Sequence, residues 1–285
     1  MIAGLEVGGR GALHLREERV TSSASSGPSN GGASRAAAAD GSAWTLLFAS
    51  DLHLGKRRGA RGAVLLEALL ERAQAAAPDV ILLGGDLVDA RAGNAMLEEC
   101  VARLAAVAPV AAVAGNHDVA AGLAEVRAAV RAGGGRWLHD AALTLTRAGR
   151  RPLRCTAVGH VRAEAETETE TKADTETDVD VDAASEMGRA ADAGALHAIV
   201  GHHPAATARA AARHRVDVAF AGHLHGGQCV LWQRGTLLYP GALFSRWNGL
   251  RFAIGAATLL VSRGVADTLP LRFHCPREVV RCRLT

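Results

Sequence analysis

The 285-residue sequence predicts one α/β domain with mixed β-sheets. Hydrophobic residues make up 49% of the chain, so most of it can bury a core and fold. Short apolar runs alternate with Ala-rich stretches of helical periodicity, which is typical of strands that helices cover on both faces of a sheet. After Gly222 the helical pattern stops and strand-like runs follow one another. The sheet is therefore expected to be mixed rather than purely parallel.

The elements follow from these patterns in chain order. Short apolar runs next to Gly, Pro or Asp predict strands, and longer Ala-rich runs predict helices. The predicted strands are 44–49, 80–83, 110–114, 153–158, 197–200 and 216–221, and the predicted helices are 61–76, 94–106, 121–132 and 206–214. The strand-like runs of the C-terminal third are 229–233, 236–239, 258–261 and 279–284.

Two segments lack the apolar residues that a core needs. Residues 1–43 are expected to be a flexible lead-in to a domain at 44–285, because 21–42 is rich in Ser, Gly and Ala. A disordered acidic insert is expected at 163–193, since 163–187 holds ten acidic residues, one lysine and no aromatic residue. We expect the insert to loop out at the edge of the sheet. Without 163–187 the chain carries a net charge of +12, which suits anionic substrates or simply reflects a genome that prefers Arg.

Composition excludes several classes of protein. The five cysteines form no C-x-x-C pair, so reduced thiols in the cytoplasm are expected rather than a disulfide scaffold or zinc ribbon. The longest apolar uncharged stretches, 104–116 and 252–262, fall short of the roughly 18 residues of a membrane-spanning helix. No secretory signal is visible at the N-terminus. Residues 250–260 are apolar enough for peripheral membrane contact, but a buried strand pair is the favoured interpretation.

Five polar clusters each follow a predicted strand. They are Asp51-Leu52-His53, Gly85-Asp86-Leu87-Val88-Asp89, Gly115-Asn116-His117-Asp118, Gly201-His202-His203-Pro204 and Gly222-His223-Leu224-His225. Ligands of open α/β sheets bind outside the carboxyl ends of the strands, so these side chains are expected to meet at one rim. In extended backbone, the i, i+2 spacing of each D-x-H or H-x-H pair would direct both side chains to the same side. Carboxylate, amide oxygen and imidazole together suit Mn²⁺, Fe or Zn²⁺ better than Ca²⁺.

Each cluster alone has a simpler explanation. Asp51, Asp86 or Asp89 could be a helix N-cap, and Asn116 a turn residue. A single buried histidine is more often a hydrogen-bonded core residue than a ligand. All five simple explanations would have to hold together, which favours a shared metal site. His203 either contacts substrate or only packs beside its neighbour.

The ordered blocks D-x-H, G-D-x-x-D, G-N-H-D, G-H-H and G-H-x-H resemble the signature of the calcineurin-like metallophosphoesterases. The blocks run from Ser50 to Gln228, and 222–228 and 261–284 are similar to a bacterial branch with UDP-2,3-diacylglucosamine pyrophosphatase-like enzymes. The resemblance implies a four-layer α/β/β/α sandwich with mixed sheets. It also implies a metal-dependent phosphohydrolase that cleaves a phosphoester or pyrophosphate bond. The chain departs from the branch at Leu224, where Thr is usual, and in its acidic insert.

The resemblance implies two divalent metal ions, with Mn²⁺ expected and Fe or Zn²⁺ as alternatives. The implied ligands are Asp51, His53 and His225 for one ion, Asn116, His202 and His223 for the other, and Asp86 for both. His117 would bind no metal and would act as the general acid, with Asp89 orienting it. Two cations about 3.5–4 Å apart would neutralise the phosphate oxygens and lower the pKa of a bridging water, which supplies hydroxide for the attack.

The expected substrate is a phosphorylated small molecule or a nucleotide sugar. A DNA phosphodiesterase of the same fold is one alternative, although only 57 residues follow Gln228, too few for a domain that grips a duplex, so no stable nucleic-acid complex is expected. A scaffold that has lost catalysis should lack ligands or the general acid, and none is missing. A protein phosphatase would read G-D-x-V-D-R-G, whereas here Ala90 separates Asp89 from Arg91.

Overall fold

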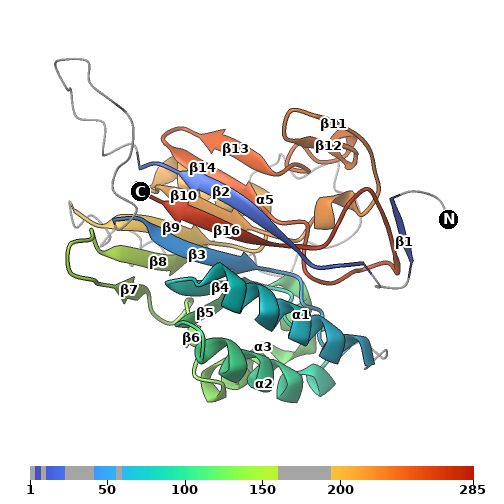
Figure 1. The fold of residues 1–285 in the computed structure, drawn as a ribbon, viewed down its shortest axis with the longest axis horizontal. Coiled ribbons are helices and arrows are strands. Elements are labelled where there is room, and N and C mark those ends of the chain that lie inside the picture. The colour runs from blue at the N-terminus through green and yellow to red at the C-terminus, as the bar shows by residue number, and fades with distance from the viewer. Residues whose placement is uncertain (1–3, 8–10, 23–41, 56–59, 160–193) are drawn as a thin grey trace.

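Two six-stranded mixed sheets pack face to face in the computed structural model, which describes residues 4–7, 11–22, 42–55, 60–159 and 194–285 (Figure 1). The strand order of the first sheet is β2 (His14–Val20), β16 (Glu278–Leu284), β3 (Trp44–Ala49), β4 (Val80–Gly84), β5 (Val110–Val113) and β6 (Arg136–Trp137). The order of the second is β13 (Arg251–Ile254), β14 (Ala257–Val261), β10 (Val218–Ala221), β9 (Leu196–Val200), β8 (Leu153–Ala157) and β7 (Leu143–Leu145).

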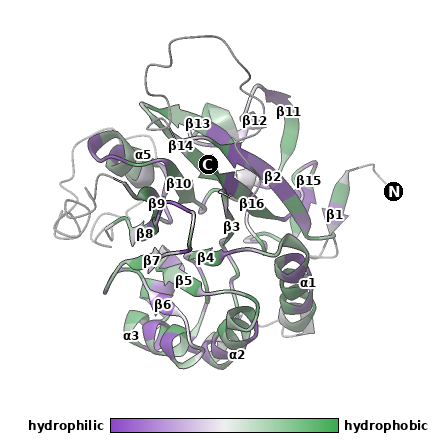
Figure 2. Ribbon diagram, turned by 60° about the vertical axis from the view of Figure 1, so that its left-hand side comes forward, coloured by the Kyte–Doolittle hydropathy of each residue, from purple (hydrophilic) through white to green (hydrophobic). Residues whose placement is uncertain are grey.

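Helices cover the outer face of each sheet. The helices on the first sheet are α1 (Ala60–Ala76), α2 (Asn94–Ala105) and α3 (Asn116–Ala132), and α5 (Pro204–Arg213) lies on the second. Short 3₁₀ turns occur at η2 (Arg91–Gly93), η6 (His225–Gly227) and η7 (Gly241–Leu243). Two smaller antiparallel pairs, β1 (Leu5–Val7) with β15 (Leu271–Phe273) and β11 (Val230–Arg234) with β12 (Leu237–Pro240), lie at one end of the molecule (Figures 1 and 2).

Alternating side chains explain the four layers. In β3, Leu46 and Phe48 face the core between the two sheets, whereas Leu47 and Ala49 face the core under the helices. The same alternation holds in β4 and β5, because successive side chains of a strand point to opposite faces. Both faces of these strands are thus apolar, and the central strands are hydrophobic along their length (Figure 2).

The direction of the strands confirms the mixed sheets. β3, β4, β5 and β6 run parallel, and β16 is inserted between β2, to which it is parallel, and β3, to which it is antiparallel. In the second sheet β8, β9, β10 and β14 are parallel, with β7 and β13 antiparallel at the edges. The predicted α/β class and the four-layer sandwich are confirmed.

The predicted strands and helices are present within a few residues of their predicted ends, with one informative difference. Helix α3 starts at Asn116 rather than at 121, because the Asp118 carboxylate accepts the backbone N–H of Gly115 and caps the first turn. The helix is interrupted at Gly122, whose φ of 111° is not helical. The predicted helix at 121–132 therefore corresponds to the part of α3 after this interruption.

The 1–43 lead-in includes two strands, β1 and β2, that pair with strands of the domain. β2 pairs with β16 along its whole length, from His14 against Glu278 to Val20 against Leu284. Its polar sequence HLREERV suits an edge strand with one solvated face. The apolar stretch 250–260 forms the β13–β14 hairpin, which is the strand pair that the sequence favoured. The acidic insert at 163–193 lies outside the described residues.

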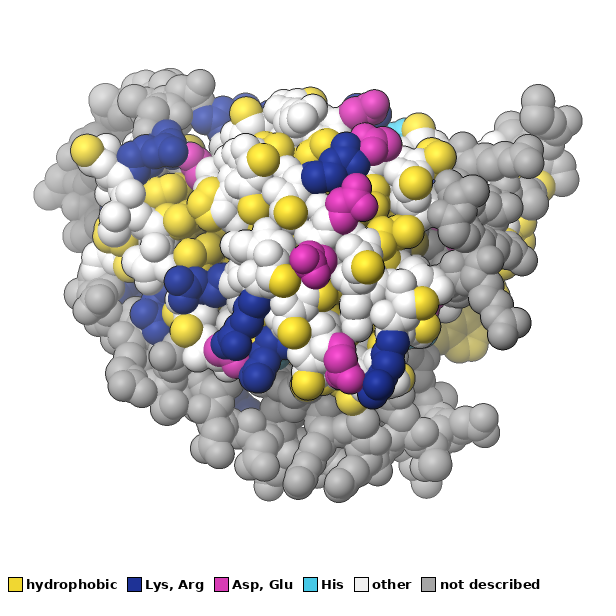
Figure 3. Space-filling model, turned by 90° about the horizontal axis from the view of Figure 1, so that it is seen from below, with side chains coloured by type: hydrophobic (Ala, Val, Ile, Leu, Met, Phe, Trp, Pro, Cys, Tyr) yellow, Lys and Arg dark blue, Asp and Glu magenta, His cyan; other side chains and the backbone are white. Residues whose placement is uncertain are grey.

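The face formed by the helices of the first sheet mixes charges of both signs (Figure 3). Arg103 pairs with Glu67 at 2.6 Å, and Arg131 pairs with Asp140 at 2.6 Å. Arginine on this face is therefore balanced by acids rather than forming a basic patch. None of the helices in the described ranges has the length and apolar run needed to cross a membrane.

Candidate metal centre

The five polar clusters meet where the carboxyl ends of both sheets come together. Three follow β3, β4 and β5 of the first sheet, and two follow β9 and β10 of the second. One side-chain contact across the sheets joins Oδ2 of Asp86 to Nε2 of His202 at 3.1 Å. Residues far apart in the sequence thus form one site because the two sheets are stacked with these strand ends at the same rim.

Most of the predicted ligands have left-handed backbone conformations. The residues with positive φ are Asp51 (59°), His53 (46°), Asp86 (51°), His223 (71°) and His225 (49°). This corrects the expectation of extended backbone at the i, i+2 pairs, since each pair lies in a tight turn after its strand. Residues other than Gly rarely adopt this region, and such strain persists where the surrounding structure fixes it, often at functional sites.

Two glycines allow these turns to approach one another. A Cβ on Gly115 would collide with Oδ1 of Asp86, and a Cβ on Gly222 would lie 2.6 Å from Oδ2 of Asp51. Glycine is thus required at both positions by lack of space. Gly85 needs glycine for both reasons, because its φ is 85° and a Cβ would lie 2.7 Å from the backbone nitrogen of Gly115.

Asp51, His53 and His225 form the first group of donor atoms, and all three side chains are buried. Nε2 of His53 lies 3.2 Å from Nε2 of His225, and Nε2 of His225 lies 3.5 Å from Oδ1 of Asp51. The Ser50 hydroxyl donates to Oδ2 of Asp51 at 2.6 Å, which holds the carboxylate in place.

The second group surrounds Asp86. Nε2 of His202 lies 3.1 Å from Oδ2 of Asp86 and 3.3 Å from Nδ1 of His223. Asn116 begins α3, and its Oδ1 is buried without a hydrogen-bond partner. A buried amide oxygen without a hydrogen bond is costly. A metal ion bound by the neighbouring side chains would give this oxygen a partner.

The outer nitrogens of the histidines are already engaged. Nδ1 of His53 lies 2.6 Å from Oδ1 of Asp89, Nδ1 of His202 lies 2.9 Å from the Gly84 carbonyl, and Nδ1 of His225 lies 3.2 Å from the Ala266 carbonyl. Each contact holds Nδ1 against an acceptor and directs Nε2 to the site, which is the usual arrangement of metal-binding histidines. The residues present therefore fit divalent metal ions.

Asp89 contacts two of the site histidines with the same oxygen. Its Oδ1 lies 2.6 Å from Nδ1 of His53 and 2.9 Å from Nδ1 of His117. Nε2 of His117 then faces the site, 4.0 Å from Oδ2 of Asp86, and the His117 side chain is 37% exposed. Unlike the buried histidines, His117 can therefore reach a bound molecule from solvent.

Burial and neighbouring charges give the site histidines different pKa values. Burial lowers the pKa of both His223 and His225 to about 4, so the two rings are neutral near pH 7. Burial also opposes charge on His202, but the adjacent Asp86 carboxylate outweighs it and raises the pKa to about 9. Asp86 itself is desolvated, yet His202 and His53 hold its pKa well below the ordinary value. The carboxylate thus remains charged in this buried position.

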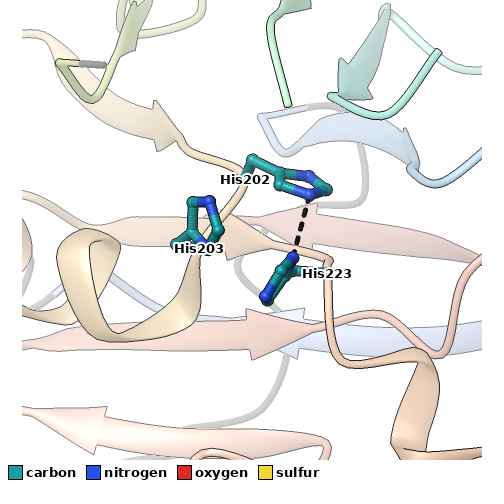
Figure 4. A group of neighbouring side chains, drawn as sticks. All are labelled: His202, His203 and His223. Carbon is teal, nitrogen blue, oxygen red and sulfur yellow. Dashed lines mark hydrogen bonds between the residues drawn. The ribbon is translucent and has the colours of Figure 1, made fainter. Parts of the chain in front are cut away.

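His203 lies beside the second group. Its ring centroid is 4.1 Å from that of His223 and 5.1 Å from that of His202. Figure 4 shows His203 just before α5, close to both rings, while the hydrogen bond joins His202 to His223. Its side chain can offer a nitrogen to the same space as the other two histidines.

Two supporting residues had no role assigned to them from the sequence. The buried Asp118 accepts the backbone N–H groups of Leu87 and Val88, both at 2.9 Å, and so joins the Asp86 loop to α3. Arg272 is 1% exposed and donates to the Ala266 carbonyl at 2.7 Å, the same carbonyl that Nδ1 of His225 contacts. The G-N-H-D motif could have indicated Asp118, whereas no sequence signal marks one arginine among many.

Comparisons with known proteins match the part of the chain that carries the site. A family model described as calcineurin-like phosphoesterase matches residues 45–227. The uncharacterized protein YpbG of Bacillus subtilis (strain 168) is 26% identical over 236 residues, covering 82% of this chain and 78% of that protein.

Solved structures with similar folds are more distant. TT1561 of Thermus thermophilus has 16% identity and a TM-score of 0.49 over 79% of this chain and 91% of its own. Nuclease MPE of Pseudomonas putida has 18% identity and a TM-score of 0.37, covering 78% of this chain and 76% of its own. Purple acid phosphatase PPD1 from yellow lupin (Lupinus luteus) has 11% identity and a TM-score of 0.44, covering 81% and 46%. The family match contains all five polar clusters.

Proposed function

Because the chain belongs to the calcineurin-like phosphoesterase family and is a metal-dependent phosphoesterase, we propose that its rim holds two divalent ions that act on one phosphate group. One ion would be held by Asp51, His53 and His225, the other by Asn116, His202 and His223, and Asp86 would contact both. The contact between Asp86 and His202 carries this proposal, since it places donor atoms from both sheets around one carboxylate.

The ions would neutralise phosphate oxygens and lower the pKa of a bound water. The chain's own residues supply the rest. Asp89 holds Nδ1 of His117 at 2.9 Å and so leaves Nε2 to carry the transferable proton. We propose that His117 donates this proton to the leaving oxygen as general acid. Its partial exposure lets it reach a substrate that the buried ligands cannot contact directly.

We propose a phosphodiester or pyrophosphate of a small molecule as the substrate class. UDP-2,3-diacylglucosamine is one candidate, because 222–228 and 261–284 resemble that branch of the family. A protein-phosphatase role is less well supported, since Arg91 is 75% exposed and pairs with Glu125 at 3.1 Å. Mn²⁺ is the proposed metal, with Fe and Zn²⁺ as alternatives.

An activity screen with Mn²⁺ tests the proposal. It compares bis-nitrophenyl phosphate, a nitrophenyl monoester, UDP-diacylglucosamine, double-stranded DNA and a phosphoserine peptide. We expect turnover of a diester or pyrophosphate with two metal equivalents per chain by elemental analysis. Cleavage of DNA alone would favour the nuclease alternative, and metal content below one equivalent after Mn²⁺ loading would contradict the metal assignment.

A further inference from the structure

Exposed hydrophobic side chains gather on one part of the surface. Of the seven large hydrophobic side chains exposed in the described residues, six lie in two short segments near the candidate metal centre. These six form what we call the apolar rim: Leu231, Trp232, Leu243, Phe244, Leu269 and Leu271. Phe244 is 75% exposed and Leu243 is 68% exposed. Exposed hydrophobic residues are ordinary when they are scattered singly, whereas a group of them marks an interaction site. The seventh residue, Val64, lies on α1.

The two segments of the rim are held side by side. β11 pairs with β12, which leads directly into η7, so 231–244 is one continuous unit. The buried Gln228 donates through Nε2 to the carbonyls of Leu269 and Leu271, at 2.9 and 3.0 Å. Figures 1 and 2 show the β11–β12 pair and the β1–β15 pair, which contains Leu271, at the same end of the molecule.

The exposure of the rim belongs to an ordered structure. Trp232 stacks on Tyr239, with centroids 5.1 Å apart and planes at 8°. On the inner side of the hairpin, Leu238 packs with Val230 and Cys275 in a small core. Nδ2 of the buried Asn248 donates to the Leu238 carbonyl at 2.7 Å. The apolar groups are thus presented to solvent by a fixed hairpin.

The exposed charge on the hairpin and η7 is basic. The sequence contains no Asp or Glu from 218 to 266, but it contains four arginines. Arg234 and Arg246 are exposed beside the hairpin and η7, and Arg246 lies 4.8 Å over the Trp247 ring. Aromatic and aliphatic groups flanked by arginine match the boundary between lipid headgroups and acyl chains.

We propose that the apolar rim docks on an anionic lipid surface. Trp232, Leu243 and Phe244 would enter the headgroup region, and Arg234 and Arg246 would contact anionic headgroups. Self-association through the hairpin is less favourable, since a second copy would bring its own Arg234 and Arg246 against the same two arginines. The proposal concerns binding and does not depend on the proposed catalytic function.

The rim is physically connected to the metal centre. The Cys275 thiol, part of the small core under the hairpin, donates to the His225 carbonyl at 3.3 Å. A Cβ built on Gly226 would lie 3.2 Å from Cδ1 of Leu238, so the hairpin packs directly on the loop that carries His225. Docking through the rim therefore brings this loop to the level of the lipid headgroups.

Vesicle co-sedimentation of the full chain tests the proposal. Vesicles of phosphatidylcholine with phosphatidylglycerol are compared with vesicles of phosphatidylcholine alone. We expect binding to the anionic vesicles only, and weaker binding when salt rises from about 0.1 M to about 1 M. The double variant Trp232→Ser/Phe244→Ser should bind at least about tenfold more weakly, because both anchors lose their apolar area. Arg234→Gln/Arg246→Gln should reduce the salt dependence.

Val64→Ser is the matched control, since Val64 is 70% exposed but lies outside the rim. It should bind vesicles like the parent chain. The rim variants should keep the parent's melting temperature and its turnover of soluble bis-nitrophenyl phosphate. Failure of the parent chain to bind, or an equal loss in Val64→Ser, would overturn the proposal. A dimer in sedimentation analysis that the double variant abolishes would show that a second copy covers the rim instead.

Discussion

Asp86 is the residue on which the two halves of the candidate site depend. Its Oδ1 accepts the backbone N–H of His117 at 2.9 Å, and its Oδ2 faces His202 at 3.1 Å and His53 at 3.9 Å. One carboxylate therefore touches groups that follow β3, β5 and β9. To reach them, Asp86 has a left-handed backbone conformation, with φ of 51°, which is strained for a residue other than glycine.

Asp86→Asn should remove both metal ions while the chain stays folded. The amide keeps the size of the side chain but removes the negative charge that two cations would share. Elemental analysis after Mn²⁺ loading should find well under one equivalent per chain. Asp140→Asn is the matched control, because Asp140 pairs with Arg127 and Arg131 on the helical face. Retention of either ion in Asp86→Asn would argue against a bridging carboxylate.

His117→Ala should keep its metal ions and lose turnover by roughly 10²–10⁴-fold, the usual contribution of a general acid. His117 is absent from the predicted ligands, and its Nδ1 is held by Asp89. The loss should be smaller for nitrophenyl esters, whose leaving groups need less protonation. Steady-state kinetics on nitrophenyl and alkyl esters measures the difference. Equal losses on both would indicate that His117 positions the phosphate rather than donating a proton.

At the scale of the elements, His197 joins three neighbouring strands of the second sheet. It lies on β9, its Nδ1–H donates to the Arg215 carbonyl at 2.9 Å just before β10, and its Nε2 accepts from the Thr156 hydroxyl of β8 at 2.8 Å. Burial lowers the pKa of His197 below its ordinary value, so the folded chain keeps the ring neutral. The unfolded chain binds a proton near pH 6.5, so stability should fall as the pH drops through that value.

His197→Asn should therefore reduce the slope of the free energy of unfolding against pH on the acidic side of neutrality. It should also cost about 1–3 kcal/mol at about pH 7.5, because buried partners lose their hydrogen bonds. Urea unfolding of metal-free protein between about pH 5.5 and 7.5 measures both effects. His14→Asn, at the exposed start of β2, serves as the control for the loss of one histidine. An unchanged slope in His197→Asn would show that other groups cause the pH dependence.

The elements that the sequence predicts are those with strong apolar periodicity. Central strands such as β3 and β4 are apolar on both faces and were recognisable, as were α1 and α2. β2 was not, because this edge strand carries polar residues and gains its stability from pairing with the distant β16. For the site, the five clusters were predictable because polar residues after apolar strands have a defined place in α/β folds. The left-handed turns and Arg272 depend on tertiary contacts that no local pattern records.

At the scale of the whole molecule, the connection between β8 and β9 determines what the acidic insert can be. The two strands are parallel neighbours, with Leu153 opposite Leu196. The chain must therefore cross from the carboxyl end of one strand to the amino end of the next, which needs about a dozen residues. Removing 163–187 leaves 158–162 and 188–195, which are sufficient for this crossover, whereas a direct short join between the strand ends would not be.

Deletion of 163–187, with a Gly-Ser bridge, should therefore leave the melting temperature within a few degrees of the parent. Loop length changes closure entropy by only about 0.6 kcal/mol per doubling. If the ten acids of the insert compete with anionic substrate, the deletion should be faster at about 0.1 M salt but not at about 1 M. Thermal melts and kinetics at both salt concentrations give the answer. Equal turnover would make the insert a passive linker, and insoluble protein would show that it supports the fold.

The insertion of β16 between β2 and β3 sets an order of events during synthesis. β3 ends at Ala49, but its neighbour begins at Glu278 and is made more than 200 residues later. At about 5–20 residues per second, a ribosome needs roughly 10–50 s to cover that distance. Throughout this time one edge of β3 has no partner, and an open apolar edge can pair with other nascent chains. The Asp51 turn also waits for its backbone contact with Ala266. Protection of this edge of β3 from aggregation thus depends on a strand that is made more than 200 residues after it.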